Sequence, residues 1–144
     1  MKDGRYYIDT CIYLNLWQKE EINGIKLWKY AKDFLESIDK KSETIYYSGF
    51  IFKELMHILA EEEFQKKKIL FESSPNFKKV ILSEREFQIA RQIEKETKSS
   101  VSFFDIIHML LAKKTNSILI TRDNKLIQIS KKYVIEVKKP EELL

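Results

Sequence analysis

The chain has 144 residues, of which 44% are hydrophobic and 33% charged, and this balance is typical of one globular domain rather than a disordered chain. The net charge of +4 favours a polyanionic partner such as nucleic acid but does not identify one. A single cysteine excludes an internal disulfide, and no apolar run has the length of a signal peptide core or a membrane span. We therefore expect one domain over residues 1–144, located in the cytoplasm, with no membrane partner.

Short apolar runs alternate with amphipathic stretches along the chain. In order, this pattern predicts a strand over 5–9, helices over 10–17 and 22–39, a strand over 44–47, a helix from 48 to about 63 that continues over 64–72, a strand over 79–82, helices over 84–97 and 103–114, a strand over 117–121, a helix over 124–130 and a strand over 133–137. Strands that alternate with helices indicate an α/β fold with a mainly parallel sheet.

Local signals define several of these helices. Ser48, Ser83 and Ser102 each precede a predicted helix and are suited to the N-cap position. The helix at 22–39 carries an apolar stripe at helical spacing, and we expect Trp28, which lies on that stripe, to belong to the core.

Four acidic residues stand where a carboxylate is costly unless it is paired or bound to a cation. Asp9 and Asp123 follow predicted strands, whereas Glu54 and Asp105 interrupt the apolar faces of two helices. Ligands of parallel sheets bind beyond the carboxyl ends of the strands, and the topology of such a sheet can bring all four residues to one rim. Hard oxygen donors select Mg²⁺ or Mn²⁺, so we expect a divalent metal site.

Each of these acidic residues also has a simpler explanation. Asp9 and Asp123 can be N-caps of the helices that follow them. Asp105 completes an S-x-x-D capping box with Ser102. Glu54 can lie at the edge of the apolar face with its head group in water. The spacing alone leaves the metal site and these structural roles open.

Four short segments occur in a fixed order over nearly the whole chain. They are Tyr7-Ile8-Asp9-Thr10, Phe52-Lys53-Glu54-Leu55, Phe104-Asp105-Ile106-Ile107-His108 and Leu119-Ile120-Thr121-Arg122-Asp123. In these segments the chain resembles the PIN-domain family. The resemblance implies a three-layer α/β/α sandwich with a mainly parallel central sheet, and a ribonuclease that depends on a divalent metal.

The resemblance also assigns roles to residues. It implies that Asp9, Glu54, Asp105 and Asp123 are the catalytic and metal-binding residues for Mg²⁺ (or Mn²⁺). The supporting hydroxyl groups would be those of Thr10 and Thr121. Cys11 departs from the family pattern, because many relatives have a polar residue there, and this puts one local polar contact in doubt.

Residues beside the acidic ones extend the expected site. His108 lies three residues after Asp105 on the same side of a helix, and both a role in proton transfer and a structural role remain open for it. Arg122, beside the acidic site, is expected to contact RNA. So are three consecutive lysines, Lys66, Lys67 and Lys68, for which a solvated helix face is the simpler explanation.

A chain of this length is most similar, within the family, to the VapC-type toxins of toxin–antitoxin pairs. The resemblance thus implies an endoribonuclease with RNA as substrate, a cognate antitoxin, and a homodimer. Two alternatives stay open: a stand-alone RNA-processing PIN nuclease, and a catalytically inert PIN-like binding module. A phosphoacceptor signalling domain fits less well, because the first strand ends in a single acidic residue, Asp9.

Overall fold

The computed structural model describes residues 4–144, and its centre is a five-stranded sheet with the order β5-β4-β1-β6-β7. All neighbouring strands of this sheet pair in parallel. The strands are β1 (Arg5–Ile8), β4 (Thr44–Tyr47), β5 (Phe77–Lys79), β6 (Ile118–Ile120) and β7 (Val137–Lys138). The predicted α/β fold with a mainly parallel sheet is therefore confirmed.

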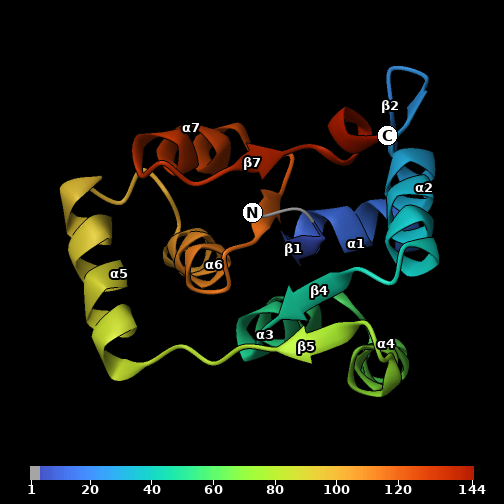
Figure 1. Cartoon of the computed structure of the whole chain (residues 1–144), viewed down its shortest axis with the longest axis horizontal. Helices are drawn as coiled ribbons and strands as arrows, with labels where there is room; N and C mark the ends of the chain where they lie inside the picture. Colours follow the sequence, from blue (N-terminus) through green and yellow to red (C-terminus); the bar gives the residue numbers. More distant parts are fainter. Residues whose placement is uncertain (1–3) are drawn as a thin grey trace.

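Helices cover both faces of this sheet. They are α1 (Thr10–Trp17), α2 (Leu27–Lys40), α3 (Gly49–Ile58), α4 (Glu61–Ser73), α5 (Glu84–Glu96), α6 (Phe103–Lys114), α7 (Asn124–Lys132) and the short 3₁₀ helix η1 (Pro140–Leu143). Figure 1 shows α5, α6 and α7 on one side of the sheet and α1, α2 and α4 on the other. This arrangement is the three-layer sandwich that the family resemblance implies. Within residues 4–144, no helix has both the length and the apolar character needed to cross a bilayer.

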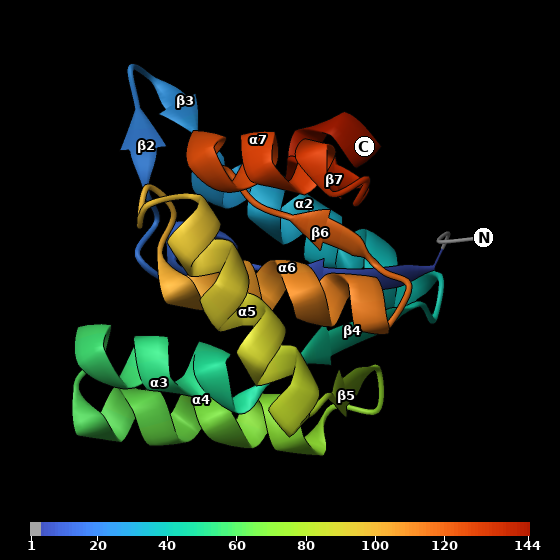
Figure 2. The ribbon, with the colours of Figure 1, turned by 90° about the vertical axis from the view of Figure 1, so that its left-hand side faces the viewer.

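The helix predicted at 22–39 begins later, at Leu27, because the preceding residues form a small antiparallel hairpin of β2 (Glu21–Ile22) and β3 (Ile25–Lys26). Its turn is Asn23-Gly24, and both residues have positive φ angles, of 51° and 80°. Asn-Gly between apolar residues is a strong hairpin signal, which the helical periodicity obscured. The hairpin projects from the body of the molecule (Figure 2).

The prediction for Trp28 is wrong. Its side chain is half-buried and lies outside the cluster of buried core residues. The later start of α2 places this residue in the first turn, next to the projecting hairpin. The buried face of the helix is instead formed by Ala31, Phe34 and Ile38.

Three other boundaries differ from the prediction. The helical stretch from 48 to 72 is broken at Leu59 and Ala60, both extended, and so forms the hairpin of α3 and α4. The edge strand β5 ends at Lys79 rather than residue 82, although Val80 remains buried. Strand β7 starts only at 137, because Val134 has a φ of 57° and is 87% exposed, which is incompatible with a continuous strand from 133.

The three predicted serine caps have different outcomes. Ser83 forms a full capping box with Glu86 at the start of α5, and the Ser102 hydroxyl accepts a hydrogen bond from the Asp105 backbone N–H at the start of α6. Ser48 occupies the N-cap position of α3, but its hydroxyl makes no capping bond. It turns instead toward Tyr7 of β1.

Aromatic packing joins α4 to the sheet. Phe71 is 2% exposed and its ring lies 5.0–5.5 Å from the rings of four other aromatic residues. These are Tyr13, Tyr47, Phe52 and Phe77. Aromatic pairs in such contact stabilise a fold beyond the effect of burial alone.

We predict that Phe71→Ala lowers the free energy of unfolding by about 3–5 kcal/mol, because it leaves a cavity at the centre of this cluster. Urea unfolding followed by circular dichroism measures the change. The matched control is Ile81→Ala, since Ile81 is 72% exposed and its loss should change stability by no more than about 0.5 kcal/mol. Equal effects of the two substitutions would contradict this description of the core.

Candidate metal centre

The four acidic residues meet at the carboxyl edge of the sheet. Asp9 directly follows β1, Asp123 lies just beyond β6, and Glu54 and Asp105 extend from α3 and α6. They share an open hollow of about 400 Å³. It is lined by Asp9, Thr10, Cys11, Leu14, Glu54, Ile58, Asp105, Arg122 and Asp123. The structure therefore brings together all four residues that the sequence singled out.

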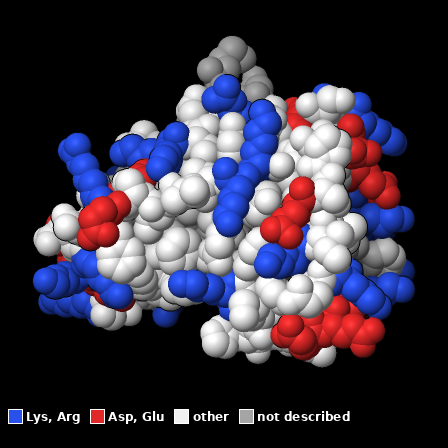
Figure 3. All heavy atoms as spheres, turned by 90° about the horizontal axis from the view of Figure 1, so that it is seen from below, with Lys and Arg blue, Asp and Glu red and all other residues white. Residues whose placement is uncertain are grey.

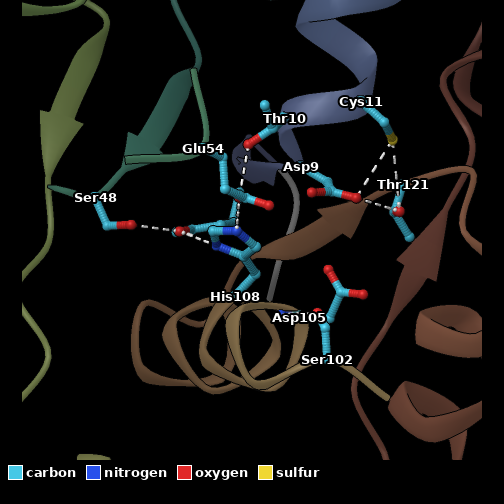
Figure 4. A network of polar contacts seen from close by, with 10 residues as sticks. Asp9, Thr10, Cys11, Ser48, Glu54, Ser102, Asp105, His108 and Thr121 are labelled. Atoms are coloured by element: carbon cyan, nitrogen blue, oxygen red, sulfur yellow. Dashed lines mark hydrogen bonds and ion pairs between the residues drawn. The ribbon is translucent and has the colours of Figure 1, made fainter. Parts of the chain in front are cut away.

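Asp9 is fixed by side chains from neighbouring segments. It is 5% exposed, and its Oδ2 atom accepts hydrogen bonds from Thr121 Oγ1 at 2.8 Å and Cys11 Sγ at 3.3 Å (Figure 4). Burial, with the nearby charge of Asp9, raises the pKa of the Cys11 thiol well above its ordinary value, so the thiol stays protonated and can donate. Asp9 occupies the N-cap position of α1, as its simpler explanation predicts, but its carboxylate makes no capping bond there.

Glu54 is held by two donors on one oxygen atom. Its Oε1 accepts hydrogen bonds from Thr10 Oγ1 at 2.8 Å and from His108 Nε2 at 2.5 Å. Burial alone would raise the pKa of Glu54, but the bonds from His108 and Thr10 outweigh burial and lower it below the ordinary value. Glu54 is therefore a carboxylate at neutral pH whose Oε1 atom has fixed protein partners, whereas its simpler explanation placed the head group in water.

Asp123 and Asp105 stand in different electrostatic environments. Asp123 caps α7, since its Oδ1 accepts from the backbone N–H groups of Lys125 and Leu126 at 2.9 and 3.3 Å, so the predicted N-cap is confirmed. Burial, together with the negative charges of Asp9 and Asp123, raises the pKa of Asp105 from 3.8 to about 6. Burial and the repulsion from these neighbouring carboxylates therefore make the charged form of Asp105 unfavourable.

His108 lies behind Glu54 and is completely buried. Since a carboxylate can only accept, Nε2 carries a proton and donates it to Glu54. The other ring nitrogen, Nδ1, lies 2.7 Å from the hydroxyl oxygen of Tyr7, which lies 2.7 Å from Ser48 Oγ. Burial alone would lower the pKa of His108, but the bond to Glu54 and the charges of Asp9, Glu54 and Asp105 raise it.

The donor set of the hollow suits a divalent cation. Asp9 and Glu54 each offer a carboxylate oxygen, and these atoms lie within 4.8 Å of each other and of a ring nitrogen of His108. His108 itself lies behind Glu54 and outside the lining of the hollow. Carboxylates crowded in this way repel, and the charges of Asp9 and Asp123 add to burial, the larger cause, in raising the pKa of Asp105. Bound Mg²⁺ or Mn²⁺ would compensate that repulsion, and oxygen donors are the ligands that these ions prefer.

Arg122 lines the hollow, and two of its three guanidinium nitrogens already have partners, whereas Nη2 is buried without one among the described residues. Nε donates to Asn15 Oδ1 and Nη1 donates to Glu141 Oε2 of η1, both at 2.8 Å. The positive charge is therefore used largely in holding the C-terminal 3₁₀ helix against the wall of the site. Neither partner could be predicted from the sequence, because Asn15 and Glu141 lie 107 and 19 residues from Arg122 in the chain.

The three predicted RNA-binding lysines lie on α4, outside the lining of the hollow. Lys66 pairs with Glu62 at 4.0 Å, and Lys67 pairs with Glu63 at 3.3 Å while its ammonium group lies 4.8 Å from the centre of the Trp17 ring. The structure therefore does not bring these lysines to the acidic residues.

Sequence reasoning missed Tyr7 and Ser48. The sequence contains one signal for Tyr7. Residues two apart on a strand point to the same face of the sheet, so Tyr7 is expected on the same face as Asp9. The hydroxyl of Ser48 was assigned to a helix cap, and only the packing of α3 against β1 shows its partner.

A family model for the PIN domain matches residues 6–132. The chain belongs to the PIN domain family. This assignment confirms the resemblance carried by the four acidic segments. The matched range includes Asp9, Glu54, Asp105 and Asp123. No curated protein sequence matches the chain in a sequence search.

Solved PIN-like structures resemble this PIN domain over almost their full length. VapBC2 from Rickettsia felis, bound to a DNA fragment from its promoter, is similar with a TM-score of 0.65 and 18% identity, over 94% of this chain and 98% of that one. FitAcB from Neisseria gonorrhoeae has a TM-score of 0.60 and 15% identity over the same shares. FitAB bound to the IR36 DNA fragment has a TM-score of 0.60 and 16% identity, over 94% of each chain. At these identities the likeness establishes the fold.

The pKa of Asp105 makes a prediction for the metal-free PIN domain. Because the folded-state pKa of about 6 is above the ordinary 3.8, the stability that this group contributes is present below pH 3.8 and is lost as the pH rises through 6. Asp105→Asn should therefore raise the free energy of unfolding at pH 7.5 in EDTA, by about 1 kcal/mol once solvent screening is allowed for.

Urea unfolding at pH 7.5 and at pH 4 measures this difference, which should vanish at the lower pH. Asp33→Asn, on α2 away from the hollow, is the control. A metal-free Asp105→Asn variant that is less stable than the wild type at pH 7.5 would contradict the electrostatic description of the site.

Proposed function

We propose that this PIN domain, comprising residues 1–144, is a divalent-metal-dependent endoribonuclease that hydrolyses RNA phosphodiester bonds. The observation that carries the proposal is the convergence of Asp9, Glu54, Asp105 and Asp123 on one hollow at the carboxyl edge of the parallel sheet. Parallel α/β folds place their ligand sites at this edge. Four carboxylates that meet in one hollow suit a metal and a phosphate rather than an apolar ligand.

The residues of the hollow would have two kinds of role, binding the cation and orienting the residues that bind it. Asp9, Glu54 and Asp105 would hold Mg²⁺ or Mn²⁺, and Asp123, which uses one oxygen to cap α7, would contribute its other oxygen. A cation bound there supplies a more acidic water and positive charge for the phosphate oxygens. Thr121 orients Asp9 through its hydroxyl and accepts a hydrogen bond from the Asp123 backbone N–H at 3.1 Å. Thr10 orients Glu54.

Basic side chains support RNA as the polyanionic substrate. The net charge of the chain is +4. Figure 3 shows basic side chains across the middle of one face of the molecule, with acidic ones between and around them. Lysines at the surface would contact phosphates without reading sequence, and Lys66, Lys67 and Lys68 remain proposed contacts of this kind. Arg122 would act at the edge of the site while anchored to Glu141.

We further propose that the chain is the toxin of a VapBC-type toxin–antitoxin pair. The solved structures that it resembles are named as the VapBC2 and FitAB assemblies. An open apolar groove of about 320 Å³, lined by residues that include Trp17, Leu35 and Leu70, supports the proposal that a partner protein binds. We also propose a cytoplasmic location and a homodimer. Light scattering of the purified protein would measure its molar mass and so test the homodimer.

The test of nuclease activity is cleavage of a mixed pool of single-stranded and structured RNA with Mg²⁺, with Mn²⁺ and with EDTA. We predict cleavage only with the metals. Asp9→Asn should lower the rate by more than about 100-fold, since even the outer-shell partners of a metal typically contribute 10–100-fold. Asp33→Asn removes a carboxylate outside the hollow and should cleave as the wild type does.

No cleavage by a folded protein that also binds no Mn²⁺ in calorimetry would contradict the nuclease and favour the inert binding module. Metal-dependent cleavage that persists in Asp9→Asn would show that another site is responsible.

The toxin proposal makes a separate prediction in cells. Induced expression of the wild-type chain without a partner should arrest growth, whereas Asp9→Asn should not, because its acidic site is incomplete. Growth curves after induction measure the effect, with Asp33→Asn as the control. Normal growth at a high level of active wild-type protein would contradict the toxin and favour a stand-alone RNA-processing nuclease.

A further inference from the structure

We propose that Tyr7 and His108 are positioning residues that fix Glu54 for the cation through a buried chain of hydrogen bonds beginning at Ser48. This inference rests on the proposed metal-dependent function and adds to it two residues that bind neither metal nor substrate. The chain runs from Ser48 to Tyr7, His108 and Glu54. Figure 4 shows Ser48 at one end and His108 beside Glu54 at the other.

The geometry of the chain is continuous. Ser48 Oγ to Tyr7 Oη and Tyr7 Oη to His108 Nδ1 are both 2.7 Å, and His108 Nε2 to Glu54 Oε1 is 2.5 Å. Ser48, Tyr7 and His108 are all at most 1% exposed. Water therefore does not compete for these bonds, and each member has its orientation fixed by the next.

His108 is placed to act through Glu54 and not as a ligand itself. It is absent from the lining of the hollow, whereas Glu54 is part of it. The Nε2 proton is already donated to Glu54 Oε1, and imidazole is not the donor that Mg²⁺ prefers. Since Thr10 binds the same oxygen, Oε2 is the atom of Glu54 left for the cation.

Burial alone does not account for the pairing of Tyr7. Tyr13, the other fully buried tyrosine of similar exposure, has a hydroxyl group with no hydrogen-bond partner among the described residues. The fold therefore tolerates a buried tyrosine without a partner. The hydroxyl of Tyr7, by contrast, has two partners, one on α3 and one on α6, and these helices carry Glu54 and Asp105. Tyr7 thus joins β1 to both helices of the acidic site.

The two tyrosines provide a matched pair of variants. Tyr7→Phe and Tyr13→Phe each remove one buried hydroxyl group and keep the ring. Calorimetric titration with Mn²⁺, in parallel with cleavage kinetics, compares them. We expect Tyr7→Phe to weaken Mn²⁺ binding by about tenfold, in the range found when outer-shell partners are lost, and to lower kcat with little change in KM. Tyr13→Phe should have the Mn²⁺ affinity, the kcat and the KM of the wild type.

Thermal unfolding in EDTA shows that each variant is folded. Unchanged Mn²⁺ affinity and kcat in folded Tyr7→Phe would overturn the inference and leave the nuclease intact. A wild-type protein that binds no Mn²⁺ would overturn the proposed function itself, and the inference with it.

A second comparison tests whether His108 acts through Glu54 or binds the cation itself. His108→Gln keeps an N–H donor for Glu54 and should retain more Mn²⁺ affinity than His108→Leu. Pulsed electron paramagnetic resonance of Mn²⁺-loaded wild-type protein should show no coupling to a directly bound imidazole nitrogen. Such a coupling, lost in His108→Gln and kept in a His57→Gln control, would make His108 a ligand and overturn its positioning role.

Discussion

The position of β1 in the centre of the parallel sheet determines the rest of the site. Because β1 pairs with β4 on one side and β6 on the other, Asp9 emerges beside Thr121, which follows β6. The backbone N–H of Asp9 donates to Ile120 O at 2.9 Å, which fixes the register at this edge. Tyr7, two residues earlier, reaches α3 and α6 from the same face. One short strand therefore places Asp9 and also carries Tyr7, the anchor of the network that supports Glu54.

Electrostatics supports the proposal that this edge is a cation site and not simply a polar surface. Asp9, Glu54 and Asp123 are each compensated by neighbouring hydroxyl, imidazole or backbone donors. Asp105 has less compensation, and burial with two facing carboxylates raises its pKa to about 6. A fold selected for stability alone would not gather these charges. The cost is accounted for if a divalent cation binds among them.

Much of this site could be predicted from the sequence, because its residues occur at recognisable points of local structure. Asp9 and Asp123 follow apolar strands, and Glu54 and Asp105 interrupt apolar helical faces. The partners could not be predicted, since the bonds from Thr10 to Glu54 and from Tyr7 to His108 span 44 and 101 residues. Only the tertiary fold determines such pairs.

The errors in the fold prediction also have physical causes. The Asn-Gly turn of the β2–β3 hairpin has a clear sequence signal, but the helical periodicity of the residues that follow it predicts a helix instead. The ends of the edge strands are harder to predict from the sequence. Val80 is buried but does not extend β5, and the positive φ of Val134 makes β7 start later than predicted. Apolar residues at the end of an edge strand look the same in sequence whether the strand continues or stops.

The central claim is that the acidic residues at the carboxyl edge of the sheet form a cation site. Anomalous diffraction from crystals soaked in MnCl₂ tests it directly. The account predicts a Mn²⁺ peak within coordination distance of Asp9, Glu54 and Asp105, with His108 still bonded to Glu54 and not to the metal. Crystals that show no peak at this edge at saturating Mn²⁺, or a peak only elsewhere on the molecule, would contradict it.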